Sequence, residues 1–292
     1  MVLKKAFDWM VMSDIYASAI AAGIAIIAAA VLGLKLDPFA IAAVFFTALT
    51  VYSLNRQDDG DIDAINIPER TRFVSKKGWM ILVFSTAGFF ALLTYAWLFS
   101  FQVFVIMASV YILGLFYSFP LLRPLSGILG FSRLKEPLGV KNLLISGMYG
   151  TFVLIPIVHA HALFSTLAGI LFAFIFLRFF IVSTIFDMRD IEGDSKKNIV
   201  TIPLTFGKDT TLGLLHGLNL LTVLIGIVGS FFHLVSAMFG SMMLATFLFS
   251  LYYLEECRKE DADMRYLCSV VVEADFVPAL AIAIPFLLMP FF

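Results

Sequence analysis

The stretch VFFTALTVYSLNRQDDGDID, residues 44 to 63, joins an apolar run to four aspartates that lie within six residues. The whole chain of 292 residues is 61% hydrophobic and only 14% charged, with a formal net charge of −1. Soluble domains are roughly 45 to 50% apolar, and a helix needs about 20 apolar residues to cross a bilayer. The sequence therefore predicts a membrane protein with several spans, one of which ends in an acidic cluster.

Nine segments are long and apolar enough to be such spans. Strand patterning is absent, and an open sheet could not satisfy its backbone hydrogen bonds in lipid. We therefore predict an all-α membrane protein that forms a single domain over residues 1–292. The first apolar run has span length and no small-residue cleavage pattern behind it, so we expect it to remain as a helix. The predicted transmembrane helices cover residues 10–33, 38–55, 78–99, 101–119, 142–159, 163–186, 210–231, 233–254 and 269–291.

Basic residues fall almost entirely on one side of these spans. Of the 20 Lys and Arg residues, 18 lie at the N-terminus or in the connections after the even-numbered spans, leaving only Lys35 and Arg178. Cytoplasmic loops carry the excess of Lys and Arg. We therefore predict a multi-pass protein of the cell membrane, with the N-terminus in the cytoplasm and the C-terminus outside. The two long polar connections, near 56–77 and 187–209, would share the cytoplasmic face.

The first of these connections begins with acidic residues at helical spacing. If the second span continues as a helix, at about 100° per residue, Asn55, Asp59 and Asp63 fall within an arc of roughly 80°. Gly60 weakens such a helix and could end it early. The spacing predicts one oxygen-rich stripe at the inner end of the span.

The second connection repeats the pattern in DMRDIEGD, residues 187 to 194. Asp187, Asp190 and Asp194 cover an arc of about 60° on a helix. Facing carboxylates repel one another unless a cation lies between them, and oxygen ligands without His or Cys favour Mg²⁺ or Mn²⁺. Because Mg²⁺ is usually held by one or two carboxylates and substrate phosphates, the two stripes predict a clamp for a metal-bridged diphosphate. The alternative is that both clusters only mark solvated helix ends.

Several stretches match motifs that occur together in one enzyme family. Asn55, Asp59 and Asp63 match NDxxDxxxD, and AINIPER at 64–70 is close to AINRPER. DMRDIEGD matches DxxDxxxD and is followed by KKNIVTIPLTFG. YSFP at 117–120 and GVKNLL at 139–144 are similar to the family's end of span four and start of span five. Over nearly its whole length, the chain resembles the UbiA superfamily of intramembrane prenyltransferases.

This resemblance implies nine helices around a central lipid-accessible cavity, where Mg²⁺ and both motifs hold a prenyl diphosphate, expected to be geranylgeranyl diphosphate. The diphosphate leaves, and a lipophilic acceptor captures the allylic centre. Metal ions neutralise a departing diphosphate, and a cavity without water protects a reactive cation. The 32 Phe residues supply ring faces that attract cations. Membrane lipid is the expected environment, and no nucleic-acid partner is expected.

The resemblance also implies roles for particular residues. The metal ligands would be Asn55, Asp59, Asp63, Asp190 and Asp194, with Asp187 assisting. The catalytic residues would be Asp59, Asp190 and Asp194. The candidate contacts to the substrate are Arg70, Arg123 and Lys141 at the diphosphate, and Tyr117 and Asn142 as polar walls of the cavity.

Two departures from the family pattern leave the acceptor open. Arg56 stands where the family commonly has Asp, which removes a possible ligand and adds a cation. After AIN the chain reads IPERTRFV where many members have RPERPIPSG. The candidate acceptors are an aromatic acid or quinone precursor, a geranylgeranylglyceryl phosphate of archaeal ether lipids, a haem or chlorin, and a carotenoid.

Other protein classes were weighed against the enzyme. A cation-coupled transporter with acidic clusters at its inner mouth is the main alternative, although transporters usually bury their ion sites near the midplane in broken helices. An alcohol phosphatidyltransferase would need a DG…AR…G…D…D pattern, which is missing after Asp59. Hydropathy excludes a soluble isoprenyl diphosphate synthase, and the paired DDxxD motifs of that class are also absent.

Several ionisable residues lie inside or near the ends of spans, where they are functional candidates by default. We expect Arg178 to be structural, with a buried acid such as Asp14 or Glu273 as its partner. Binding of the acceptor by Asp14 or Glu273 is the less favoured alternative. Cys257 and Cys268 fall in one connection without the spacing of a metal site, so we expect free thiols.

Overall fold

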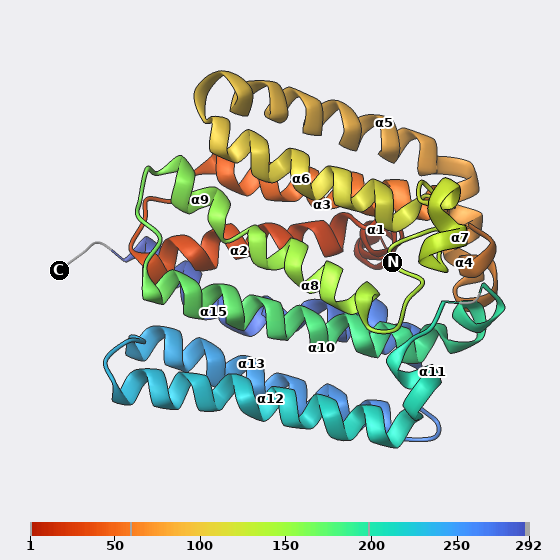
Figure 1. The fold of residues 1–292 in the computed structure, drawn as a ribbon. Helices are drawn as coiled ribbons and strands as arrows, with labels where there is room; N and C mark the ends of the chain where they lie inside the picture. Colours follow the sequence, from red (N-terminus) through yellow and green to blue (C-terminus); the bar gives the residue numbers. More distant parts are fainter. Residues whose placement is uncertain (1, 59, 198, 290–292) are drawn as a thin grey trace.

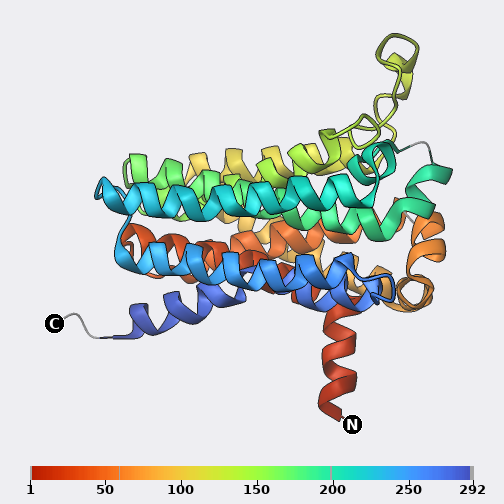
Figure 2. The same cartoon turned by 90° about the horizontal axis from the view of Figure 1, so that it is seen from below.

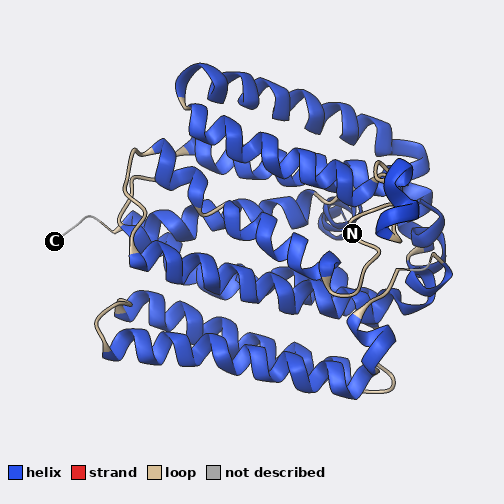
Figure 3. Cartoon of the chain, viewed as in Figure 1, coloured by secondary structure: helices blue, strands red, loops and turns tan. Residues whose placement is uncertain are grey.

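The computed structural model describes residues 2–58, 60–197 and 199–289, and within them it holds helices and connections but no strand (Figure 3). Nine helical segments of this described part are long and apolar enough to cross a membrane. The prediction of an all-α membrane protein is therefore confirmed. The helices are α1 (Val2–Met12), α2 (Ile15–Leu32), α3 (Pro38–Asp58), α4 (Gly60–Asn66), α5 (Pro68–Phe99), α6 (Phe101–Ser118), η1 (Arg123–Leu125), α7 (Ser126–Leu129), α8 (Val140–Thr151), α9 (Leu154–His159), α10 (Thr166–Lys196), α11 (Ile202–Phe206), α12 (Lys208–Phe231), α13 (Ala237–Arg258), α14 (Met264–Tyr266), η2 (Leu267–Val272), η3 (Glu273–Phe276) and α15 (Val277–Leu288).

Most of the long helices pack side by side as a closed ring, and α5 packs against two of them, α3 and α6. Helix α2 contacts α3, α3 contacts α6, α6 contacts α8 and α9, and α8 contacts α10. The ring continues from α10 through α12 and α13 to α15, which returns to α2. In Figure 1 the short helices α4, α7 and α11 gather at one end of the bundle, and the C-terminal helix α15 points toward the other. All the polar connections that carry the acidic motifs thus lie at the same end.

Helix α2 is narrow enough to pack closely against the last span. Its sequence IYASAIAAGIAIIAAAVL is rich in alanine, and small residues let transmembrane helices approach one another. A Cβ atom added at Gly23 would lie 2.6 Å from Cδ1 of Leu280 on α15, closer than real Cβ contacts come. A larger residue at position 23 would therefore require the Leu280 side chain to move.

The ends of several spans differ from the predicted bounds. The first membrane helix begins at Ile15 rather than at residue 10, because Asp14 has a left-handed backbone (φ 58°) that separates α1 from α2. Figure 2 shows α1 projecting sideways from the bundle. Helix α5 begins at Pro68 rather than at 78, and α10 continues to Lys196 rather than ending at 186. The whole second acidic motif is therefore helical, as its spacing predicts.

The last span is an interrupted helix. Residues Leu267–Val272 form a π-helical turn and Glu273–Phe276 a 3₁₀ turn before α15 begins at Val277. π-Turns inside helices are frequent at functional sites, and irregular backbone at membrane depth is tolerated where it is buried or lines a cavity. The interruption turns the Glu273 side chain toward the cavity described below.

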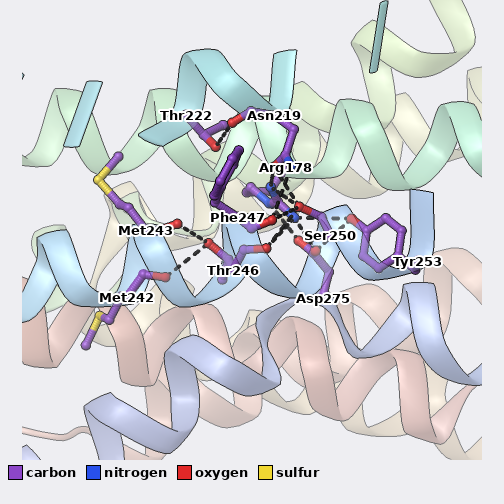
Figure 4. A network of polar contacts seen from close by, with 10 residues as sticks. All are labelled: Arg178, Asn219, Thr222, Met242, Met243, Thr246, Phe247, Ser250, Tyr253 and Asp275. Atoms are coloured by element: carbon purple, nitrogen blue, oxygen red, sulfur yellow. Dashed lines mark hydrogen bonds and ion pairs between the residues drawn. The ribbon is translucent and has the colours of Figure 1, made fainter. Parts of the chain in front are cut away.

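A buried polar network lies beside this interruption (Figure 4). The Arg178 guanidinium on α10 forms a bidentate ion pair with Asp275, and its Nε atom lies 2.8 Å from Asp275 Oδ2. Nη1 donates to Asn219 Oδ1 at 2.6 Å, and Nη2 donates to Tyr253 Oη at 3.1 Å. The prediction that Arg178 has a buried acidic partner is right, but the expected partners were wrong. Arg178 faces α12 and α13, where η3 supplies Asp275, whereas Asp14 pairs with Arg56.

Candidate active site

Both acidic motifs open into one cavity at the end of the bundle that carries α4 and α11. The empty space of the cavity, counted together with its open mouth, is about 1350 Å³. Its polar end contains Asn55, Asp63, Asp190 and Asp194. A hydrogen bond from the Gly193 backbone N–H to Asn66 Oδ1, 3.2 Å long, joins α10 to α4. This contact holds the helices of the two motifs together.

The first motif is divided between two helices. Asn55 lies near the end of α3, where its Oδ1 accepts hydrogen bonds of 3.3 Å from Ser118 Oγ and from Lys135 Nζ. Asp63 lies on α4 and accepts a hydrogen bond from Arg56 Nη1 at 3.3 Å. Asp59, the predicted metal ligand and catalytic residue between them, lies outside the described residues. Both described members of the stripe line the cavity.

The second motif lies on one continuous helix, and a lysine joins two of its carboxylates. Lys141 Nζ lies 2.7 Å from Asp187 Oδ1 and 3.0 Å from Asp194 Oδ2. Asp190 also faces the cavity, and it pairs with Arg189 at 2.6 Å. Asp187 is fully buried and is not part of the cavity wall. Lys141 therefore connects this buried carboxylate to Asp194, which does line the cavity.

The predicted substrate contacts fall into two groups. Arg70, Tyr117 and Lys141 line the cavity. Asn142 does not: it is fully buried, and its Nδ2 donates to Asp187 Oδ2 at 2.8 Å. Arg123 is exposed at the start of η1 and also lies outside the cavity wall. The expected cavity contacts of Asn142 and Arg123 are therefore not formed, because Asn142 turns toward α10 and Arg123 sits on a connection that leaves the bundle.

Tertiary structure brings further groups to the cavity that the sequence did not single out as site residues. Arg56 and Arg189 do so from inside the two motifs, where each is a basic residue among aspartates. Lys135 is almost fully buried, and its Nζ lies 5.3 Å from the centre of the Tyr117 ring. The Tyr149 and Phe179 rings stack in the deeper, apolar part. No local pattern distinguishes these two rings from the many that face lipid or core.

Asp14 also lines the cavity and shapes its electrostatics. Its carboxylate lies 3.1 Å from Arg56 Nε, so that Arg56 bridges Asp14 and Asp63. Burial by itself would raise the pKa of Asp14, but the positive charges of Arg56 and Arg70 outweigh it and hold the pKa below its ordinary value. Asp14 is therefore ionised and serves as a fixed negative charge.

The ligand atoms that the cavity offers are of the type that a hard divalent cation binds. Asn55, Asp63, Asp190 and Asp194 offer only oxygen ligands, which suit Mg²⁺. Among the described residues no three His, Cys, Asp or Glu side chains converge closely enough to hold a metal by themselves. Mg²⁺ is usually held by one or two carboxylates and completed by waters and substrate phosphates.

Comparison with known proteins identifies relatives of this fold. The sequence model of the UbiA prenyltransferase family matches residues 16–269. A solved structure described as digeranylgeranylglyceryl phosphate synthase is 18% identical, with a TM-score of 0.62 and coverage of 97% of this chain and 99% of that one. A UbiA homolog from Aeropyrum pernix K1 is 19% identical, with a TM-score of 0.61 and coverages of 93% and 94%. A UbiA homolog from Archaeoglobus fulgidus bound to GPP and Mg²⁺ is 14% identical, with a TM-score of 0.66 and coverages of 96% and 99%. No curated protein matches the sequence.

Proposed function

The chain belongs to the UbiA prenyltransferase family, and we propose that it transfers a geranylgeranyl group from its diphosphate to a lipophilic acceptor within the membrane. The observation that carries the proposal is the meeting of both acidic motifs at one cavity whose other end is apolar. A prenyl diphosphate has the same division, with a doubly charged head and a hydrocarbon chain. The family assignment leaves the transporter alternative without support.

In this proposal, Mg²⁺ is held by the acidic motifs and neutralises charge on the departing diphosphate. Support comes from the oxygen-only donor set and from the homolog whose structure holds GPP and Mg²⁺. Asp59, Asp190 and Asp194 are the proposed catalytic residues. The proposed ligands are Asn55, Asp59, Asp63, Asp190 and Asp194, with Asp187 assisting from behind.

Cationic side chains hold the diphosphate head. Lys141 bridges two carboxylates of the second motif, and Lys135 contacts Asn55 of the first. Both ammonium groups line the cavity beside Tyr117, so each is placed to donate to phosphate oxygens. Of the predicted contacts, Lys141 and Tyr117 keep their proposed roles in donor binding.

The deeper cavity suits the prenyl chain and the developing positive charge. Val110, Ile145 and Met148 form an apolar wall there. The stacked Tyr149 and Phe179 rings offer π-faces, which attract cations. An apolar wall disfavours water, and this would protect the allylic centre from hydrolysis until the acceptor reaches it.

The proposed acceptors are an aromatic or quinone precursor and the geranylgeranylglyceryl phosphate of archaeal ether lipids. The second is favoured by the relative described as digeranylgeranylglyceryl phosphate synthase. The positive-inside distribution of Lys and Arg supports a cytoplasmic cavity, with an external C-terminus. Thiol labelling of Lys196→Cys in intact cells would remain low in this orientation and become efficient only after permeabilisation.

A purified sample in lipid nanodiscs tests the reaction. With Mg²⁺ and geranylgeranyl diphosphate, the protein should release diphosphate only when an acceptor from either class is added. Asp59→Ala and Asp190→Ala should each abolish this release, whereas Asp209→Ala, at an exposed position on α12, should not. Full turnover in either motif variant would contradict the proposal that the two motifs bind Mg²⁺ for catalysis. Ion flux in liposomes without diphosphate release would instead favour a transporter.

A further inference from the structure

The hairpin of α12 and α13 takes no part in the cavity wall. Among the described residues, the cavity is lined by side chains up to Ile199 and again from Ser269 onward, and by none from the two spans between them. In Figure 1 the hairpin runs along the outer side of the bundle, where α12 packs against α10. What the hairpin offers to the rest of the bundle is a set of polar side chains.

These side chains hold Arg178 of α10 and Asp275 of η3 (Figure 4). Asn219 on α12 accepts a hydrogen bond of 2.6 Å from Arg178 Nη1, and Ser250 on α13 donates to the same Asn219 oxygen at 2.6 Å. The Tyr253 hydroxyl on α13 accepts from Arg178 Nη2 at 3.1 Å and donates to Asp275 Oδ1 at 2.8 Å. Each nitrogen of the guanidinium and each oxygen of the carboxylate therefore has a partner.

A network of this kind specifies an arrangement more than it adds stability. Burying two charges costs about as much as their pairing returns, and well-packed apolar residues of similar volume are often equally stable. A rotated helix, however, would leave buried donors and acceptors unpaired, which is costly. Arg178 and Asp275, which are 0% and 1% exposed, are therefore suited to fix the rotation of the interrupted last span against α10.

The residues next to this pair connect it to the cavity. Phe179 follows Arg178 on α10, and Phe276 follows Asp275 on η3. The rings of Phe179 and Phe276 stack, with centroids 5.2 Å apart and planes 24° apart. Phe179 also stacks on Tyr149 at 3.5 Å between centroids, and both of these rings line the cavity. A shift of η3 would therefore disturb the aromatic stack in the deep part of the cavity.

The interrupted span also contributes to the cavity wall directly. Ser269 in the π-turn and Glu273 in the 3₁₀ turn line the cavity. The Tyr16 hydroxyl donates to the Val270 carbonyl at 3.1 Å, which ties the π-turn to α2. The interruption is thus anchored to α2 through Tyr16 and to α10 through Asp275, and the direction of its cavity side chains depends on both anchors.

We propose that Arg178 and Asp275 are positioning residues for the prenyl transfer. With the α12–α13 hairpin as their frame, they set the rotation of the last span and thereby the arrangement of the aromatic stack. The inference rests on the proposed function, in which these rings face the prenyl chain and the allylic centre. A displacement of about 1 Å can slow a reaction about a hundredfold. The acidic motifs, at the other end of the cavity, keep their hold on magnesium and diphosphate.

The charge-free double variant Arg178→Met with Asp275→Leu tests the proposal in lipid nanodiscs. It should unfold at nearly the denaturant concentration of wild type, because neither charge is left buried alone. With an acceptor that the wild-type protein uses, its kcat should fall by about ten- to a hundredfold. Its affinity for geranylgeranyl diphosphate and its Mg²⁺ requirement should stay close to those of wild type. A folded double variant with wild-type kcat would overturn the proposal.

Two single variants of the hairpin separate positioning from stability. Tyr253→Phe keeps the ring and removes only the hydroxyl that holds the pair, so kcat should fall by a smaller factor with little loss of stability. Leu215→Ala removes a fully buried apolar side chain of α12. It should lower the stability of the protein and leave the kcat of the folded protein unchanged. If kcat merely followed stability in both variants, the pair would be structural and the proposal wrong.

Thiol labelling measures the position of the last span without the reaction. Ser269→Cys places a thiol in the cavity wall, whereas the native Cys257 and Cys268 are fully buried. A small water-soluble reagent should label this thiol more slowly when the double variant lets the π-turn rotate, and an unchanged rate would overturn the proposal. A wild-type protein that transfers no prenyl group would contradict the proposed function instead, and the labelling rates would still decide the positioning role.

Discussion

Arg56 Nη1 lies 3.3 Å from Asp63 Oδ2, so one residue of the first acidic motif neutralises another. Its Nε atom meanwhile lies 3.1 Å from Asp14 Oδ2. Where most of the family has a carboxylate, this chain has a built-in cation between two acids. A metal that uses Asp63 must therefore compete with a guanidinium.

Arg56→Asp should raise the affinity of the protein for magnesium. The change frees Asp63 and adds a carboxylate, and ligand charge tunes the affinity of oxygen sites. The Mg²⁺ concentration for half-maximal diphosphate release should fall by roughly tenfold. Without the metal the variant should unfold at a lower temperature than wild type, because Asp14 and Asp63 lose their partner. Arg72→Asp, at an exposed position on α5, is the control, and an unchanged magnesium requirement in Arg56→Asp would contradict the competition.

Lys141→Gln should weaken donor binding and destabilise the fold together. The substitution leaves Asp187 buried without its counter-ion, and breaking a buried pair costs about 3–5 kcal/mol. Affinity for geranylgeranyl diphosphate, measured by calorimetry, should fall about ten- to a hundredfold. Lys196→Gln is the control, since Lys196 is exposed on the same end of α10. If the Lys141→Gln protein bound geranylgeranyl diphosphate as tightly as wild type, the role of Lys141 would be structural only.

Removing one partner of the Arg178–Asp275 pair should destabilise the protein more than removing both partners. Asp275→Asn or Arg178→Met each leaves a buried charge alone, at about 3–5 kcal/mol of unfolding free energy. Arg178→Met combined with Asp275→Leu removes both charges and should recover most of that loss. Denaturant unfolding in a fixed detergent measures the three variants. If the losses simply add in the double variant, the two groups are not coupled.

The loss of thermal stability at low pH should depend on Asp14. Because Arg56 and Arg70 lower its folded pKa, Asp14 contributes stability that is complete above the ordinary Asp pKa of about 4. That contribution disappears as pH falls through the lowered folded value. Between pH 5 and pH 3 wild type should therefore lose more thermal stability than Asp14→Asn. Parallel pH profiles of the two proteins would contradict the assignment.

The sequence predicts the geometry of the second acidic motif better than that of the first. The spacing of Asp187, Asp190 and Asp194 predicts a shared helical face because periodicity is a local property, and α10 does continue through them. The first motif cannot be treated in the same way. Its described residues Asn55 and Asp63 reach the cavity from two different helices, α3 and α4.

Side-chain partners were the least predictable feature. Arg178 needed a buried acid, and the sequence favoured Asp14 or Glu273 as its partner. Because α10 packs against α12 and η3 packs against α13, the acid that reaches Arg178 is Asp275. Likewise, Asn142 is indistinguishable in sequence from a residue that lines the cavity, and only the rotation of α8 turns it to Asp187.

By itself the sequence determined the membrane setting, the spans and the two acidic motifs, because apolar length and helical period are set by neighbouring residues. Tertiary structure alone decided which charges meet. It joined the motifs at one cavity, paired most of the ions around it, and left Arg70 and Glu273 without a hydrogen bond or ion pair to a side chain of the described residues. Ion pairing depends on which helices become neighbours, and that choice is made by packing over the whole bundle.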